Sequence, residues 1–140
     1  MKNDLSPGNE LTIERLVEDS DLASTISADP ADAFPRVFAT SRMVALMELA
    51  AARLMKPLLA PGEMSVGVTV DISHDAPTPA GATVRATARF RERDGKLFVF
   101  DVIAEDPAGV VGRGTHRRAI VTTERIVAGA ERRRVAPGNS

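Results

Sequence analysis

The sequence contains no cysteine, and this absence removes several classes of chemistry at once. Disulfide bonds, thiolate metal sites and a cysteine nucleophile are excluded. With only two histidines and no thiolate, a structural zinc site is not expected, and we predict no metal. A chain without cysteine fits a reducing compartment, so we expect a cytoplasmic protein.

Long apolar runs and an excess of one charge are also missing. The most apolar stretch, 43–52, is interrupted by Glu48 and is too short to span a bilayer. Residues 1–10 are polar and lack the apolar core of a signal peptide. The formal net charge is −1, and the basic cluster 132–134 is typical of a solvated chain end. We therefore expect neither nucleic acid nor a membrane as partner.

The apolar content is sufficient for one folded domain. Hydrophobic residues make up 44% of the 140 positions, which argues against disorder. We expect a single domain over 1–140, with its core at about 9–127 and a flexible tail over 128–140.

Residues 40–55 predict one long helix. The segment is rich in Ala, Leu and Met, lacks Gly and Pro, and places apolar residues at helical spacing from Met43 to Leu54. Lys56-Pro57 should end it, because the residue before a proline avoids the helical region. The apolar stripe is broad, so the helix should be largely buried.

The remaining segments alternate between apolar and polar residues, which predicts strands. A loop with at most one short helical turn is expected over 18–35. In the last strand, Gly112 and Gly114 indicate bulges or close approaches. A hairpin is indicated by Asp94-Gly95. Strands are expected over 11–17 (or a docking arm there), 64–74, 83–91, 97–104 and 110–127.

One helix that is apolar over most of its surface cannot be surrounded by water. An antiparallel sheet of about five strands, curled around that helix, buries it most economically. The pattern therefore predicts an α+β chain with the hotdog fold.

Glu48 is an isolated acid within the predicted helix. It is the only acidic residue between Asp32 and Glu63, and its neighbours one turn away are mostly apolar. An unpaired buried carboxylate is costly, and such groups serve acid, base or nucleophilic chemistry. The alternative is a solvated edge of the helix near Arg53 and Lys56, and periodicity leaves both open.

His74 continues the even-numbered apolar face of the strand 64–74, which Met64 and Val66 begin, so its side chain should point toward the helix. A single inward histidine is typical of a satisfied core residue. However, a carboxylate and an imidazole on facing elements can form an acid–base pair near neutral pH. The pattern around His116 is irregular and supports no assignment.

Thr40 and Ser41 open the predicted helix. Hydroxyl residues at this point are commonly N-caps. The functional alternative is that a hydroxyl and free backbone N–H groups converge where a negative oxygen is stabilised. No dinucleotide fingerprint, Walker loop, HExxH or GxSxG motif is present.

Four separated segments agree in order and spacing with one known family. They are FPRVFAT at 34–40, MVALME at 43–48, the strand that reaches His74, and GRGTHRR at 112–118. Over about 34–126 the chain resembles the fluoroacetyl-CoA thioesterase family of hotdog proteins.

The resemblance implies a homodimer that hydrolyses a small acyl-CoA thioester, with no cofactor beyond the CoA of the substrate. It implies that Thr40, Glu48 and His74 form the catalytic group. It also implies supporting roles for Gly67 and Arg118 in the site.

The resemblance further implies that Phe34 lies beside the acyl pocket. The sequence departs from the family pattern at Ser41, Arg42 and Leu49, which leaves the acyl group open. Two alternative functions also remain: a non-catalytic acyl-CoA binding or sensing domain, and a thioesterase that acts on an acyl carrier protein.

Overall fold

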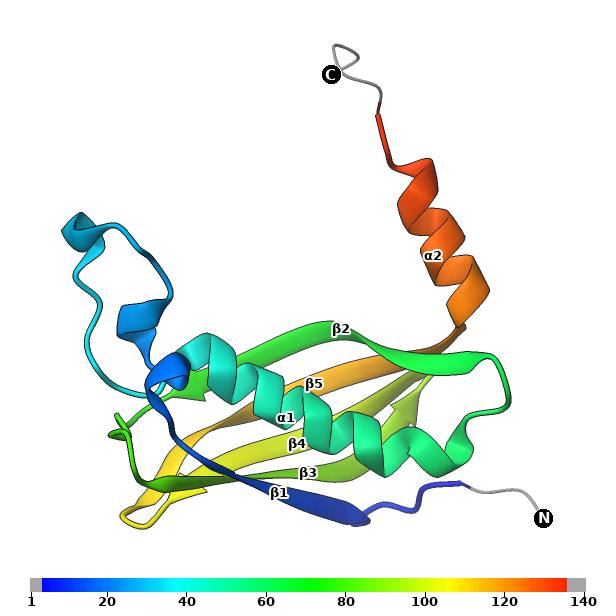
Figure 1. Cartoon of the computed structure of the whole chain (residues 1–140). Helices are drawn as coiled ribbons and strands as arrows, with labels where there is room; N and C mark the ends of the chain where they lie inside the picture. Colours follow the sequence, from blue (N-terminus) through cyan, green and yellow to red (C-terminus); the bar gives the residue numbers. More distant parts are fainter. Residues whose placement is uncertain (1–3, 136–140) are drawn as a thin grey trace.

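The computed structural model describes residues 4–135 and shows a five-stranded antiparallel sheet wrapped around one long helix (Figure 1). The strand order is β1-β3-β4-β5-β2, which leaves β1 and β2 at the edges. This arrangement is the predicted hotdog fold. The elements are β1 (Glu10–Leu16), α1 (Thr40–Met55), β2 (Glu63–His74), β3 (Thr83–Asp94), β4 (Leu97–Asp106), β5 (Gly109–Thr122) and α2 (Thr123–Arg132).

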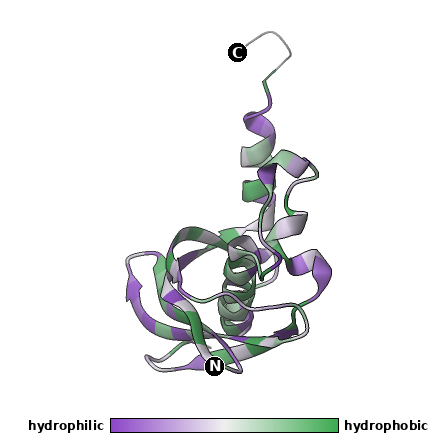
Figure 2. Ribbon diagram, turned by 90° about the vertical axis from the view of Figure 1, so that its left-hand side faces the viewer, coloured by the Kyte–Doolittle hydropathy of each residue, from purple (hydrophilic) through white to green (hydrophobic). Residues whose placement is uncertain are grey.

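The core lies between α1 and the concave face of the sheet. Met43, Met47 and Met55 on α1 are at most 1% exposed. Ala86 and Ala88 on β3 are fully buried, and their small side chains let the helix lie close to the strand. Figure 2, which looks nearly along α1, shows the sheet curling around it.

Strand β2 changes its alternation part-way, contrary to the sequence prediction. Its register with β5 shifts between Gly67 and Thr69. Gly67 faces α1, because a Cβ there would lie 2.5 Å from a side-chain oxygen of that helix. Beyond the shift His74 faces α1, as predicted, but Met64 and Val66 do not share its face, since one extra residue reverses the alternation.

The last strand ends at Thr122 instead of residue 127. The Thr122 side chain accepts a hydrogen bond from the backbone N–H of Arg125 and caps α2. The sequence prediction of a strand to residue 127 is wrong, because the cap starts a helix that runs to Arg132. Residues 128–132 are therefore helical and not tail, and residues 136–140 lie outside the described residues.

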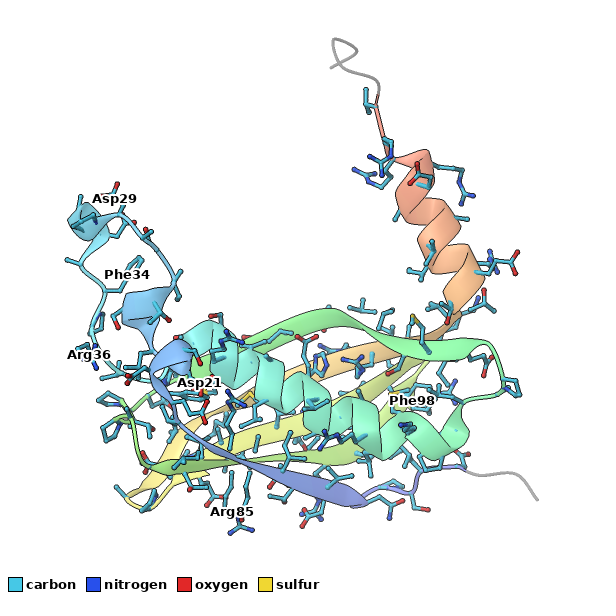
Figure 3. The ribbon with its side chains drawn as sticks, in the orientation of Figure 1. Asp21, Asp29, Phe34, Arg36, Arg85 and Phe98 are labelled. Atoms are coloured by element: carbon cyan, nitrogen blue, oxygen red, sulfur yellow. The ribbon has the colours of Figure 1, made fainter. Side chains whose placement is uncertain are left out.

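The segment 18–36, called the 18–36 loop below, contains three short 3₁₀ turns and not one. Its base is held by Asp21, whose side chain is fully buried. The carboxylate accepts hydrogen bonds from the Arg15 guanidinium and the backbone N–H of Glu18, each at 2.9 Å. Burial disfavours the charged form, but these bonds outweigh it and lower the pKa of Asp21. Figure 3 shows Asp21 beside the start of α1 and Asp29 at the tip of the loop.

The free edge of β2 exposes two valines. Residues 67–71 are all exposed, and Val68 and Val70 keep 51% and 43% of their surface. A long exposed apolar edge invites pairing with another strand.

Within residues 4–135, no helix has both the length and the apolarity needed to cross a membrane.

Position 112 has no room for a side chain. The sequence predicted a close approach of another part of the chain to Gly112, and this is confirmed. A Cβ there would lie 2.3 Å from the Ser73 carbonyl oxygen and 2.8 Å from the Met43 sulfur, whereas a Cβ at Gly129 on α2 meets nothing closer than 3.7 Å. We predict that Gly112→Ala lowers the free energy of unfolding by about 1–3 kcal/mol. The matched Gly129→Ala should be neutral or stabilising by up to about 1 kcal/mol. Urea unfolding measures both, and equal effects would contradict the assignment.

Candidate functional site

Thr40 and His74 meet where α1 begins and β2 ends. The Thr40 Oγ1 lies 2.7 Å from His74 Nδ1. The N-cap of α1 is Ala39, and no side chain caps the helix, so the capping interpretation of Thr40 is wrong. The threonine hydroxyl instead holds the imidazole in place.

A cleft of about 380 Å³ adjoins this pair. It lies beneath the 18–36 loop and is lined by Ala23, Pro35, Val37, Phe38, Thr40, His74, Asp75, Ala76 and Pro77. Within residues 4–135, His74 Nε2 is buried and has no hydrogen-bond partner. An unpaired buried polar atom is costly, and such atoms mark sites where a further group binds.

Glu48 belongs to a second group, on the side of α1 that faces Gly67 and Arg118. Its Oε1 lies 3.6 Å from Arg118 Nη1, and its side chain is 39% exposed. In the described part of the chain neither Arg53 nor Lys56 forms an ion pair with Glu48. The solvated-edge interpretation is therefore wrong about the partners of Glu48, although the side chain is partly exposed. A side chain at position 67 would collide with the carboxylate, so glycine leaves the space that Glu48 occupies.

The Arg118 guanidinium is held on several sides. Its Nε donates to Ser65 Oγ at 3.0 Å and its Nη2 to the Ser65 carbonyl at 2.9 Å. Its Nη1 lies 3.1 Å from His116 Nε2. Burial lowers the pKa of Arg118, and the Glu48 charge counteracts this. The fixed guanidinium therefore positions the carboxylate of Glu48.

His116, which the sequence left unassigned, is a buried member of this second group. Its Nδ1 lies 2.9 Å from the Thr69 carbonyl, which can only accept, so Nδ1 carries the proton and Nε2 accepts from Arg118. Burial lowers the pKa of His116, and Arg118 adds to the effect. The signal that could have found it is the spacing of 116 and 118, which share one face of β5.

The predicted site residues thus fall into two groups within one chain. Thr40 and His74 touch, whereas Glu48 stands eight residues along α1, about 12 Å at 1.5 Å per residue. No hydrogen bond joins Glu48 to the other two in the described part of the chain. Gly67 and Arg118 lie beside Glu48, and their supporting roles stay a prediction.

Phe34 stands apart from both groups. It is 48% exposed on the 18–36 loop and borders a small hollow of about 130 Å³ within that loop (Figure 3). Its neighbour Pro35, and not Phe34, lines the cleft at His74. The role of Phe34 beside an acyl pocket stays a prediction.

The two groups together offer the chemistry of an acyl transfer. The first group provides an imidazole that a hydroxyl orients. The second provides a carboxylate that a guanidinium orients, with the backbone of Gly67 beside it. In residues 4–135, no three His, Asp or Glu side chains gather as metal ligands.

The buried His116 makes stability depend on pH. Because its pKa is lowered, the unfolded chain binds a proton there below about pH 6.5, whereas the folded chain binds one only at a lower pH. The free energy of unfolding should therefore fall as the pH decreases from 7 to 5. We predict a fall about 1 kcal/mol larger than in His116→Asn, measured by urea unfolding. Parallel pH profiles for the two proteins would contradict a neutral buried His116.

Comparison with known proteins identifies the family. The chain matches the family described as fluoroacetyl-CoA-specific thioesterase over residues 17–124. A fluoroacetyl-CoA thioesterase from Streptantibioticus cattleyicolor is 45% identical over 93 residues, which cover 66% of this chain and 67% of that protein.

Solved structures agree in fold. A fluoroacetyl-CoA thioesterase superposes with a TM-score of 0.89 at 34% identity, covering 95% of this chain and 100% of that one. A thioesterase superfamily member from Thermus thermophilus gives 0.82 at 27% identity, covering 92% and 93% of the two chains. A hot-dog-like protein from Thermanaerovibrio acidaminovorans gives 0.81 at 25% identity, with 93% of each chain covered. The hotdog fold is confirmed, and this chain belongs to the fluoroacetyl-CoA-specific thioesterase family.

Proposed function

We propose that this protein hydrolyses a small acyl-CoA thioester to the free acid and CoA. The observation that carries the proposal is the Thr40–His74 hydrogen bond beside a cleft, together with a second group centred on Glu48. Membership of a thioesterase family supports it. The reaction needs no metal or further cofactor, because thiolate is already a good leaving group. A cytoplasmic location is part of the proposal.

The roles of the three side chains follow from their contacts. Glu48 attacks the thioester carbonyl to form a mixed anhydride that water then hydrolyses to the free acid, or it takes a proton from a water molecule that attacks the carbonyl directly. His74 carries the proton and delivers it to the departing thiolate through Nε2, the ring nitrogen that Thr40 leaves unpaired. Thr40 fixes the imidazole orientation. The backbone at Gly67, or the first N–H groups of α1, holds the oxyanion.

This division of roles requires the two groups to meet, and a homodimer provides the means. Glu48 faces Gly67 on the unpaired edge of β2, and His74 ends the same strand. If β2 pairs antiparallel with β2 of a second copy so that its Glu63 end lies beside the His74 end of the other, Gly67 is four strand positions from the partner's His74, compared with seven from the His74 of its own chain. Each site then combines Glu48 of one subunit with Thr40 and His74 of the other. The same pairing buries Val68 and Val70.

Residues near the start of α1 and in the 18–36 loop determine which acyl group the site accepts. Ser41 and Arg42 border a second hollow of about 610 Å³ on the other side of that loop, and Leu49 is 41% exposed. A panel of short acyl-CoAs, fluoroacetyl-CoA included, assayed by thiol release with a thiol-reactive dye, identifies the substrate. No release from any member would favour the non-catalytic acyl-CoA binding domain. Release only from acylated carrier protein, with no competition by CoA, would favour the carrier-protein thioesterase.

The catalytic assignments predict the kinetics of single variants. We expect Glu48→Ala and His74→Ala each to lower kcat by about 100-fold or more while the fold persists, because each removes an acid–base group. Thr40→Ala should have a smaller effect. It should cost the His74→Ala background almost nothing further, since the two residues act as a unit.

Single-turnover assays beside thermal melts measure these effects. Full activity in Glu48→Ala would refute the mechanism. A normal rate combined with a large loss of stability would mean that the residues are structural.

A site shared between subunits predicts complementation. When the Glu48→Ala and His74→Ala proteins are unfolded together and refolded, mixed dimers contain one site with both residues intact. Activity should recover to up to roughly a quarter of wild type, because about half of the dimers are mixed and each has one intact site. As the control, the double variant, which carries both substitutions on one chain, is unfolded and refolded alone and should show no recovery. Dimers without any recovery would place each site within one chain.

A further inference from the structure

Helix α2 has few contacts with its own chain beyond the end of β5, the strand that it follows. None of its ten residues is buried, and Ile126 and Val127 are 41% and 62% exposed. An isolated helix shorter than about 12–15 residues is marginal in water. Its apolar residues must therefore pack on a surface that the described part of the chain does not supply.

The 18–36 loop also leaves apolar side chains exposed. Residues 28–36 are all exposed, and the apolar side chains Ile26 and Phe34 keep 59% and 48% of their surface. In Figure 1 the loop and α2 both project from the body past the edge of β2, and the view in Figure 2 agrees.

The two projections stand at opposite ends of β2. The strand residue before α2, Thr122, pairs with Glu63 at the start of β2. The loop shares the cleft of His74 at the other end of the strand. Antiparallel pairing of β2 with its copy brings the Glu63 end of one subunit beside the His74 end of its partner. Helix α2 of one subunit then faces the 18–36 loop of the other.

The charges of the two segments are complementary. The loop has five acidic residues and one arginine, whereas residues 123–134 have four arginines and two glutamates. Asp29 and Asp32 at the loop tip form no ion pair in the described chain, and neither do Arg125 and Arg132 on α2. A hollow of about 480 Å³ between α2 and β5 is lined by Ile120, Ile126, Arg125 and Arg132 among others.

We propose that α2 of each subunit docks on the 18–36 loop of its partner and forms one wall of the partner's Thr40–His74 cleft. Ile126 and Val127 cover the apolar residues of the loop, and the α2 arginines face Asp29 and Asp32. This inference rests on the proposed dimer through β2. In this arrangement the 18–36 loop beside each Thr40–His74 cleft is in contact with both subunits.

The absence of cysteine allows a direct test by cross-linking. Ala31 lies at the loop tip and Ala130 on α2, and both are exposed. We expect a short bis-maleimide to join the subunits of a mixed dimer in which one chain carries Ala31→Cys and the other Ala130→Cys. The matched control pairs Ala31→Cys with Ala108→Cys, an exposed alanine in the β4–β5 turn, and should give only background.

The possible outcomes separate this inference from the dimer itself. Dimers by light scattering, with no more cross-linking from Ala130→Cys than from the control, would overturn the docking and leave the dimer standing. A monomer would overturn both.

Hydrogen exchange gives a second readout on the full chain. If α2 covers the partner's loop, Ile126→Asp should speed exchange at least tenfold at the hydrogen-bonded amides of Ala23, Ser24 and Ile26, far away in the same chain. Amides in the β3–β4 pair should be unchanged. Faster exchange in α2 alone would overturn the docking.

Discussion

The burial of α1 is the constraint on which the rest of the structure depends. Its apolar face excludes water only because the sheet curls around it, and the sheet can approach because the facing strands carry small residues. Gly112 even allows the Met43 sulfur to lie against the strand. This packing fixes both chemical groups, since Thr40 opens the helix and Glu48 stands two turns further along the same rigid element.

Strand β2 contributes residues to both groups of the candidate site. Its bulge at Gly67 gives Glu48 its space, and its end holds His74 against Thr40. The same strand is an open, apolar edge. The proposed pairing of that edge would therefore change stability and chemistry together: it would remove exposed valines from water and move the two groups toward each other.

The buried polar residues behind Glu48 explain why its position is defined although it is partly exposed. A buried guanidinium is stable only when its donors are satisfied. Arg118 achieves this with Ser65, His116 and Glu48, and the Thr69 carbonyl fixes the histidine tautomer. Removing one member leaves another unsatisfied, so the network acts as a unit.

The sequence by itself determined the fold class, the bounds of α1 and the identity of Thr40, Glu48 and His74 as candidates, because apolar periodicity and isolated polar residues are local signals. It also placed the turn at Gly95, where φ is positive. Only the tertiary structure decided the bulge in β2, the cap that turns 123–132 into a helix, the inclusion of His116, and the separation of Glu48 from His74. Those features depend on which strands pair and in which register, and contacts between residues distant in the chain leave no periodic trace in the sequence.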